Sequence, residues 1–283
     1  MPRKLTDQAV AKYARDGYCD AIPVLSPTEV ARYRAELEAW ERSVGHPLGW
    51  PEKSKSYLLF DWADQIVHHP AVLDAVEDLI GPDILVYHST TWIKEPNTEA
   101  YTLWHQDGPY FFLDPALHVT AWVALSDATV EAGCIHVLPG SHHQGPLRHE
   151  DAPGPNNMIK RGQGIPGYDH ETGVPVPVMA GQMSLHHTNL LHTSRGNHSK
   201  DRRIGFGISY IPTSVRPTGR SIPSALLVRG TDRFGHFGAE QRLGAAMSEA
   251  AVAAHAEANA RFRALQDSPS YSRRGRDSLA GVA

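Results

Sequence analysis

The chain has 283 residues, of which 41% are hydrophobic and 20% are charged, and its formal net charge at pH 7 is −4. This length is ample for a hydrophobic core, while the mild acidity argues against nucleic acid and no stretch reaches the about 18 apolar residues of a membrane span. The N-terminus lacks the apolar stretch of a signal peptide, and the two cysteines, Cys19 and Cys134, are too few for a disulfide framework or a cysteine-rich zinc site, so we expect a cytoplasmic protein.

Helices are predicted for most of residues 1–82. The first covers residues 6–16 and is capped by Thr6. A second begins at Ser26-Pro27-Thr28-Glu29, which is a capping box with proline at the first helical position. A third runs from Pro70 to Ile80 and ends at Gly81-Pro82. We interpret these helices as scaffold.

From Ile84 onwards the sequence changes to short runs rich in β-branched and aromatic residues. These runs cover residues 84–87, 90–94, 118–125, 134–138, 183–187 and 203–211. Because no helices alternate with them, they predict an antiparallel sandwich or barrel.

The remaining segments complete a single predicted domain. Residues 144–177 are rich in proline and glycine, and we interpret this long loop as a lid. An alanine-rich helix is expected over residues 239–266, and residues 267–283 are expected to be a disordered tail. One domain therefore covers residues 1–266, with a β core over 83–238 between the helical parts.

The motif Trp104-His105-Gln106-Asp107-Gly108 suggests metal chemistry. In an extended strand, His105 and Asp107 would project from the same face. An imidazole beside a carboxylate supplies two ligands of the 2-His-1-carboxylate triad that binds Fe(II). The motif alone is weak in a chain with 17 histidines. The third ligand could be His186, His187, His192 or His198, and the local pattern does not choose among them.

The run that begins at Arg203 has two distinct faces. Ile204, Phe206, Ile208 and Tyr210 alternate on a face that predicts core packing, whereas the other face carries Arg203, Gly205, Gly207 and Ser209. An arginine above small residues leaves room for a ligand, and arginine binds a carboxylate bidentately, as a dicarboxylate cosubstrate would require. The alternative is an arginine in a structural ion pair.

Four segments in the same order give the sequence a specific resemblance. Residues 102–108, 119–128, 139–142 and 192–205 are similar to the phytanoyl-CoA dioxygenase family, and the likeness runs from about Asp16 to Phe237. The resemblance implies a double-stranded β-helix (jelly-roll) core, mainly β, flanked by N-terminal helices. It also implies Fe(II), 2-oxoglutarate and O2 as cofactor and cosubstrates.

Carried over by position, the resemblance implies roles for six residues. The iron ligands would be His105, Asp107 and His192. Arg203, eleven residues after His192, would hold the distal carboxylate of 2-oxoglutarate, with Ser194 sharing it and Trp122 packing against the cosubstrate. Strand alternation favours Arg203 over Arg202, which would fall on the core-facing side.

The implied reaction is hydroxylation, or another oxidation at a C–H bond, of a small-molecule metabolite, with 2-oxoglutarate converted to succinate and CO2. Halogenases related to this family carry a small residue in place of the carboxylate, so Asp107 indicates an enzyme that is not a halogenase. No basic cluster suggests a coenzyme A site, and we expect the substrate to be a small polar metabolite, such as an amino-acid-like compound or a biosynthetic intermediate. The alternatives are a Zn(II) hydrolase or isomerase and a catalytically silent β-helix domain that binds a small ligand or a partner.

Other polar and aromatic residues near these motifs receive simpler interpretations. His186 and His187 are expected to be hydrogen-bonded neighbours of the site rather than ligands. His142 and His143 are expected to be exposed. Residues 109–112 could line a substrate pocket or fill the core, and residues 232–237 resemble a family segment to which no chemical role is assigned.

Overall fold

The structure is a computed structural model that describes residues 4–152, 154–159, 163–219, 221–241 and 244–266. The predicted tail, residues 267–283, lies outside this part of the chain. The helices expected near the N-terminus are confirmed as α1 (Asp7–Asp16), α2 (Pro27–Val44) and α4 (Pro70–Ile80). Ser26 and Glu29 form the predicted capping box of α2, and Thr6 caps α1. The 3₁₀ helix η1 (Ser56–Leu58) and α3 (Asp61–Val67) lie between α2 and α4.

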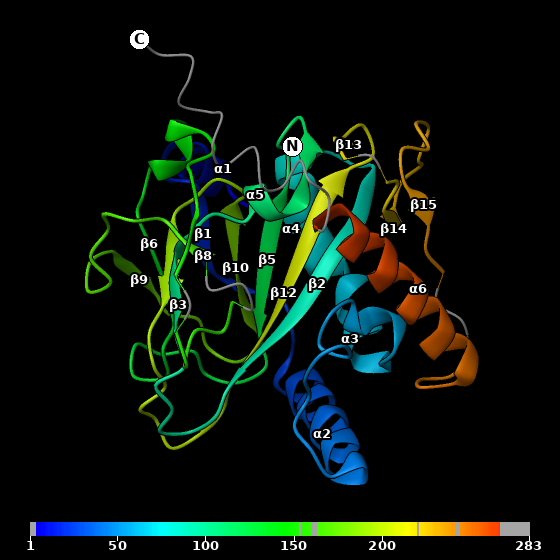
Figure 1. Cartoon of the computed structure of the whole chain (residues 1–283), viewed down its shortest axis with the longest axis horizontal. Coiled ribbons are helices and arrows are strands. Elements are labelled where there is room, and N and C mark those ends of the chain that lie inside the picture. The colour runs from blue at the N-terminus through cyan, green and yellow to red at the C-terminus, as the bar shows by residue number, and fades with distance from the viewer. Residues whose placement is uncertain (1–3, 153, 160–162, 220, 242–243, 267–283) are drawn as a thin grey trace.

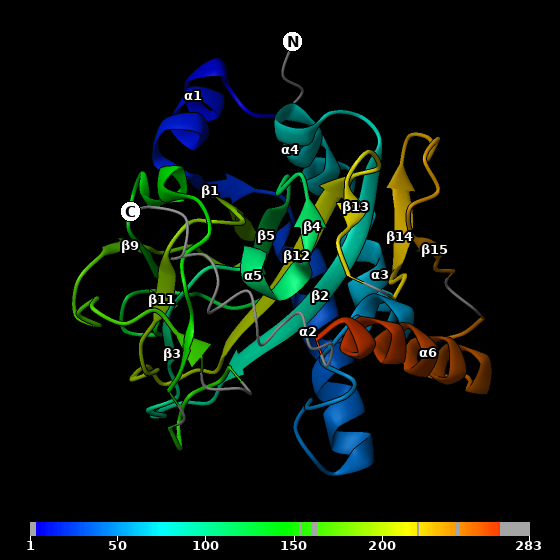
Figure 2. The ribbon, with the colours of Figure 1, turned by 45° about the horizontal axis from the view of Figure 1, so that its top comes forward.

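Two facing sheets form the predicted double-stranded β-helix (Figure 1). The larger sheet has the order β1-β10-β5-β12-β2-β14-β15. Its strands are β1 (Tyr18–Pro23), β2 (Ile84–Lys94), β5 (Val119–Ala124), β10 (Gln182–His187), β12 (Arg203–Pro212), β14 (Ser224–Arg229) and β15 (Gly238–Ala239). The smaller sheet has the order β3-β11-β6-β9, and its strands are β3 (Thr102–His105), β6 (Ile135–Val137), β9 (Val174–Val176) and β11 (His192–Ser194). Figure 2 shows β3, β9 and β11 to the left of the large sheet.

Short elements join these sheets. They are α5 (Gly108–Phe111), β4 (Leu113–Asp114), which pairs with β13 (Arg216–Pro217), the 3₁₀ helix η2 (Ser141–Gln144), and β7 (Glu150–Asp151), which pairs with β8 (Gln163–Gly164). Helix α6 (Glu249–Gln266) begins ten residues later than predicted, and the first predicted helical residue, Ala239, instead pairs with β14 as part of β15. The lid expected over residues 144–177 stays a prediction.

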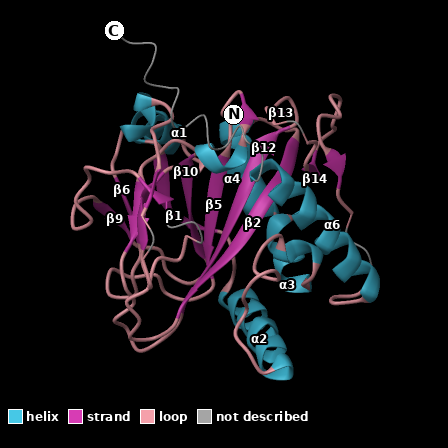
Figure 3. Ribbon diagram, viewed as in Figure 1, coloured by secondary structure: helices cyan, strands magenta, loops and turns pink. Residues whose placement is uncertain are grey.

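The main core lies between the large sheet and the helices. As the alternation predicted, Ile204, Phe206, Ile208 and Tyr210 of β12 are buried in one cluster with residues of α2, α3 and α4. The ring of Phe206, for example, packs edge-on against Trp62 of α3 at 5.2 Å between centroids. Figure 3 shows α3 and α6 beside the large sheet at the end away from β6 and β9 of the small sheet. Helices α2, α3 and α4 cover one face of β12, and its opposite face is left to the space between the two sheets.

Candidate active site

The structure brings His105, Asp107 and His192 together between the two sheets. His105 is the last residue of β3, and His192 is the first of β11 and lies opposite it in the antiparallel register. The expectation that His105 and Asp107 share one face of a strand is wrong. Asp107 has helical backbone angles (φ −73°, ψ −37°) and is the N-cap residue of α5. The chain turns at this residue, and the turn places the carboxylate beside the two imidazoles.

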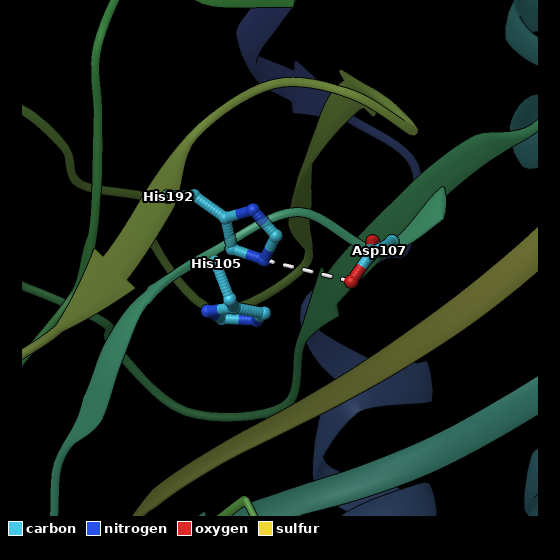
Figure 4. A group of neighbouring side chains, drawn as sticks. All are labelled: His105, Asp107 and His192. Atoms are coloured by element: carbon cyan, nitrogen blue, oxygen red, sulfur yellow. Dashed lines mark ion pairs between the residues drawn. The ribbon is translucent and has the colours of Figure 1, made fainter. Parts of the chain in front are cut away.

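The geometry of the three side chains suits one small cation (Figure 4). Each offers a ligand atom, and these atoms lie within 4.8 Å of one another. The His192 Nε2 atom is 3.7 Å from Oδ1 of Asp107, and the rings of His192 and His105 are 4.0 Å apart between centroids. Of the four histidines considered for the third ligand, both His186 and His192 approach Asp107, but among the described residues only His192 forms a compact group of ligand atoms with both His105 and Asp107. His198 lies apart with its side chain 59% exposed, beside Glu99.

Backbone carbonyls fix the orientation of both imidazoles. The Nδ1 atom of His105 lies 2.7 Å from the carbonyl oxygen of Leu103, and that of His192 lies 3.0 Å from the carbonyl oxygen of Leu190. A carbonyl can only accept, so each Nδ1 carries the proton and each Nε2 keeps its lone pair. Backbone acceptors of this kind orient metal-binding histidines.

The ionisation of the three groups also favours a cation. Burial lowers the pKa of His105 and of His192, so both imidazoles are neutral near pH 7. Burial opposes the ionisation of Asp107, but the imidazoles of His192 and His186 outweigh it and hold the pKa of this carboxyl well below its usual range. Two neutral imidazoles and one carboxylate are the protonation states that metal binding requires.

Arg203 lies in the same pocket as the triad. Its side chain is 2% exposed, Nη1 donates to the carbonyl oxygen of Gly133 at 2.6 Å, and Nε has no hydrogen-bond partner. Among the described residues no carboxylate pairs with it, so the structural ion pair considered as an alternative is absent there. Burial lowers its pKa to about 10, which leaves it charged at neutral pH. A buried cation without a counterion is costly unless an anion joins it.

Trp122 forms a wall of this pocket. Its ring lies 5.3 Å from the guanidinium carbon of Arg203, a cation–π distance. The ring crosses directly over Gly205, where a Cβ atom would meet Trp122 at 1.7 Å. The small residues of β12 thus make room for the indole as well as for a ligand. In contrast, Arg202 pairs with Glu41 and Glu95 on the other side of the strand, as expected.

Lys94 is a functional candidate that the sequence analysis missed. It lies opposite Arg203 in the register of β2 and β12, and its side chain is 1% exposed. Its Nζ donates to Oγ of Ser194 at 2.9 Å and to the carbonyl oxygen of Arg195. Burial and the nearby Arg203 charge lower its pKa to about 6. The sequence does contain a signal for Lys94: it is two residues after Trp92 in the same strand and so shares its face, and Trp92 lines the pocket.

The pocket combines candidate metal ligands with a buried cation. Its lining includes the triad, Thr120, Trp122, Ser194 and Arg203. Lys94 does not line the pocket itself but is linked to it through Ser194, to whose Oγ its Nζ donates. Ser194 Oγ is also 3.1 Å from Oγ1 of Thr102.

The other expectations around the site have mixed outcomes. His186 is a hydrogen-bonded neighbour, with Nε2 3.2 Å from Oδ2 of Asp107, as predicted. His143 is exposed, whereas His142 is half-buried. Within residues 109–112, Phe111 joins the buried cluster around Tyr87.

Gln106, between two triad residues, ties the following loop to the site. It is fully buried, and its Nε2 donates to the carbonyl oxygens of Gly145 (2.9 Å) and Asn189 (2.7 Å) while Oε1 accepts from the backbone of Leu147 (2.7 Å). Its backbone NH donates to His149, whose ring packs against Tyr110. The first residues of the 144–177 loop are thereby fastened beside the triad.

Replacing Gln106 with leucine should destabilise the protein by about 2–4 kcal/mol, since buried groups left without partners cost about 1–3 kcal/mol each. Urea unfolding monitored by far-UV circular dichroism would measure the change in the free energy of unfolding. Gln144→Leu, at an exposed position nearby, is the matched control and should change it little. Equal stability of Gln106→Leu and the wild type would contradict this role.

Two imidazoles and a carboxylate facing one cavity inside a double-stranded β-helix define a class, the non-haem metal-dependent oxygenases. The sequence model of the phytanoyl-CoA dioxygenase (PhyH) family matches residues 13–205. The chain therefore belongs to the phytanoyl-CoA dioxygenase family.

Individual relatives agree with this assignment. L-proline trans-4-hydroxylase from Streptomyces griseoviridis is 25% identical over 251 residues, which cover 78% of this chain and 92% of that protein. The apo structure of the non-heme monooxygenase ThoJ is 33% identical, with a TM-score of 0.82 and coverage of 94% of this chain and 99% of that one. The epimerase SnoN, in complex with Fe3+, alpha ketoglutarate and nogalamycin RO, is 27% identical, with a TM-score of 0.60 and coverage of 75% and 85%. Matches to several curated phytanoyl-CoA dioxygenases span only about half of their length.

Among the described residues, no helix is long and apolar enough to cross a membrane.

Proposed function

We propose that this protein is an Fe(II)/2-oxoglutarate-dependent oxygenase that hydroxylates, or otherwise oxidises at a C–H bond, a small-molecule metabolite. The observation that carries the proposal is the pairing, in one pocket, of a neutral-imidazole triad with a buried arginine that has no counterion within the described part of the chain. The triad suits a divalent cation, and the arginine suits an anionic group at the other end of the same ligand. A hydrolytic Zn(II) enzyme uses no dicarboxylate cosubstrate, so it would not account for the buried Arg203.

Each residue of the pocket has a role in this proposal. His105 and His192 would bind iron through Nε2, and Asp107 would bind it through its carboxylate. Arg203, with Ser194 and Lys94 beside it, would hold the distal carboxylate of 2-oxoglutarate. Trp122 would pack against the cosubstrate and keep water from the guanidinium.

Bound Fe(II), 2-oxoglutarate and O2 would supply the oxidising chemistry, and 2-oxoglutarate would leave as succinate and CO2. The protein orients the cosubstrate between two fixed ends and shields the reaction in a buried pocket. Asp107 fills the third ligand position, which supports hydroxylation rather than halogenation.

The substrate is proposed to be a small polar metabolite, such as an amino-acid-like compound. The similarity to an L-proline hydroxylase over 92% of that protein supports this class. The similarity to an epimerase makes other outcomes of C–H oxidation the alternative. A cytoplasmic location, with no nucleic-acid partner, stays a prediction from composition.

The proposal is tested by cosubstrate turnover. Metal-free protein is supplied with Fe(II), 2-oxoglutarate and O2, and succinate is measured with and without a panel of free amino acids that includes L-proline. We expect O2-dependent succinate formation that a true substrate accelerates, and no formation with Zn(II) in place of Fe(II). Iron-loaded protein that neither binds nor consumes 2-oxoglutarate would refute the proposal.

The affinity for 2-oxoglutarate should decrease as the pH rises above about 6. Burial and the charge of Arg203 lower the pKa of Lys94 to about 6, whereas a carboxylate beside the ammonium would raise it. Binding would therefore take up a proton, and the Kd should increase by up to about tenfold per pH unit until the pKa of the bound state is reached. Calorimetric titration of the Co(II)-loaded protein between pH 6 and 8.5 would measure this slope. Lys94→Met should bind weakly with a flatter profile, and an equal slope in both proteins would contradict the assignment to Lys94.

A further inference from the structure

The two carboxylate oxygens of Asp107 have different surroundings. Oδ1 faces Nε2 of His192 at 3.7 Å. Oδ2 instead accepts a hydrogen bond from Oγ1 of Thr120 at 2.6 Å and lies 3.2 Å from Nε2 of His186. Two hydrogen-bond donors therefore occupy one oxygen, and the other faces the neighbouring metal-binding histidine.

The large sheet aims both donors at the same atom. Thr120 of β5 and His186 of β10 are directly opposite each other in the antiparallel register. Opposite residues share one face of a sheet and lie within reach of a common partner. That face is turned towards the pocket, which Thr120 and His186 both line. The two donors thus hold Oδ2 from neighbouring strands.

A chain of hydrogen bonds fixes the direction of the Thr120 hydroxyl. Its one hydrogen is donated to Asp107, because an ionised carboxylate can only accept. The contact of 3.1 Å between Oγ1 of Thr120 and Nε2 of His118 must then be donated by the imidazole. The Nδ1 atom of His118 is left as an acceptor, and the hydroxyl of Thr188 lies 2.8 Å from it.

His118 is suited to act as a fixed neutral link. It is 1% exposed, its ring packs edge-on against Phe111, and burial lowers its pKa to about 3. Thr188 also holds the segment that carries Asp107 through its backbone, since its carbonyl oxygen accepts from the backbone NH of Gly108 at 2.9 Å. The chain from Thr188 to Asp107 therefore uses only groups whose donor and acceptor roles are determined.

From this geometry we propose that Thr120, aligned by His118 and Thr188, and His186 are positioning residues that make Asp107 a ligand through Oδ1 alone. The inference rests on the proposed function, because it concerns the carboxylate of that metal site. A carboxylate that binds through one oxygen uses one coordination position and leaves the others for the cosubstrate and O2. Outer partners that hold ligands in this way typically contribute about 10–100-fold to metal affinity or activity.

The test is a comparison of Co(II) affinity in threonine variants, measured by the visible absorption of the bound ion in anaerobic titrations. Thr120→Val keeps the shape of the side chain but removes the hydroxyl, and we expect it to weaken Co(II) binding by about 10–100-fold. Thr120→Ser restores the hydroxyl and should recover most of that loss. The matched control is Thr91→Val, which removes another buried hydroxyl of the large sheet, bonded to Ser56, and it should bind Co(II) as the wild type does.

A purely structural role would reduce the melting temperature of the metal-free Thr120→Val protein while leaving its Co(II) affinity equal to that of Thr91→Val, and this result would overturn the inference. His186→Leu should weaken Co(II) binding in the same direction, and unchanged affinity in both variants would also overturn it. The proposed function can fail separately. If the wild type binds Co(II) but addition of 2-oxoglutarate does not change the Co(II) spectrum, the oxygenase proposal is refuted. The comparison of Co(II) affinities would still test the role of Thr120. A wild type that binds no Co(II) would overturn both.

Discussion

His192→Ala should abolish metal-dependent turnover of 2-oxoglutarate. His192 is one of the three proposed protein ligands, and its Nε2 lone pair is directed into the site because its Nδ1 donates to the carbonyl oxygen of Leu190. We expect a loss of more than about 100-fold in Fe(II) affinity and in succinate formation, because even an outer partner of a metal ligand contributes about 10–100-fold. Equilibrium dialysis of Fe(II) under argon, followed by the succinate assay, would measure both quantities.

The matched control for this variant is His198→Ala. His198 is six residues along the chain and was an equal candidate by local sequence, but its side chain is exposed beside Glu99. It should retain the metal affinity and turnover of the wild type. Loss of metal in His198→Ala, or normal turnover in His192→Ala, would show that the triad is wrongly assigned.

Arg203→Ala should weaken 2-oxoglutarate binding without a comparable loss of metal. Removing one partner of a buried, hydrogen-bonded charge pair costs about 2–5 kcal/mol, which corresponds to an increase of about 30- to 5000-fold in the Kd. The proposed metal ligands lie on other elements, namely β3, β11 and the turn before α5, and should keep their affinity for Co(II). Calorimetric titration of 2-oxoglutarate into the Co(II)-loaded protein would separate the two effects.

The neighbouring arginine provides the control for this second prediction. Arg202 carries the same charge, but its guanidinium pairs with Glu41 and Glu95 away from the pocket. Arg202→Ala should therefore bind 2-oxoglutarate as the wild type does. If Arg202→Ala were the variant that lost 2-oxoglutarate binding, the assignment of the anion site would be wrong.

Local sequence patterns predicted those parts of the fold that depend on nearby residues. The cap of α2 needs only Ser26 and Glu29, three residues apart, and the capping box is present. The two faces of β12 follow from strict alternation, and the structure buries Phe206 among the helices while Arg203 lines the pocket. These features could be predicted because their partners are either adjacent in sequence or are simply the core.

Features that depend on distant residues could not be predicted in this way. The proximity of Asp107 to His105 arises from a turn into α5, not from a strand, and the sequence pattern does not distinguish the two. Lys94 reaches Ser194 because β2 pairs with β12 in one particular register. The chain from Thr188 through His118 to Thr120 requires the pairing of β5 with β10, which local periodicity does not contain.

The central claim, that the triad and Arg203 bind iron and 2-oxoglutarate together, is tested most directly by anaerobic absorption spectroscopy. Fe(II) and 2-oxoglutarate are added to metal-free wild-type protein and to His192→Ala, Arg203→Ala and Arg202→Ala. We predict a weak visible charge-transfer band of the chelate in the wild type and in Arg202→Ala, its loss in His192→Ala and its weakening in Arg203→Ala. Wild-type protein that binds iron but shows no band would contradict the account, and a catalytically silent β-helix domain would then be the better description.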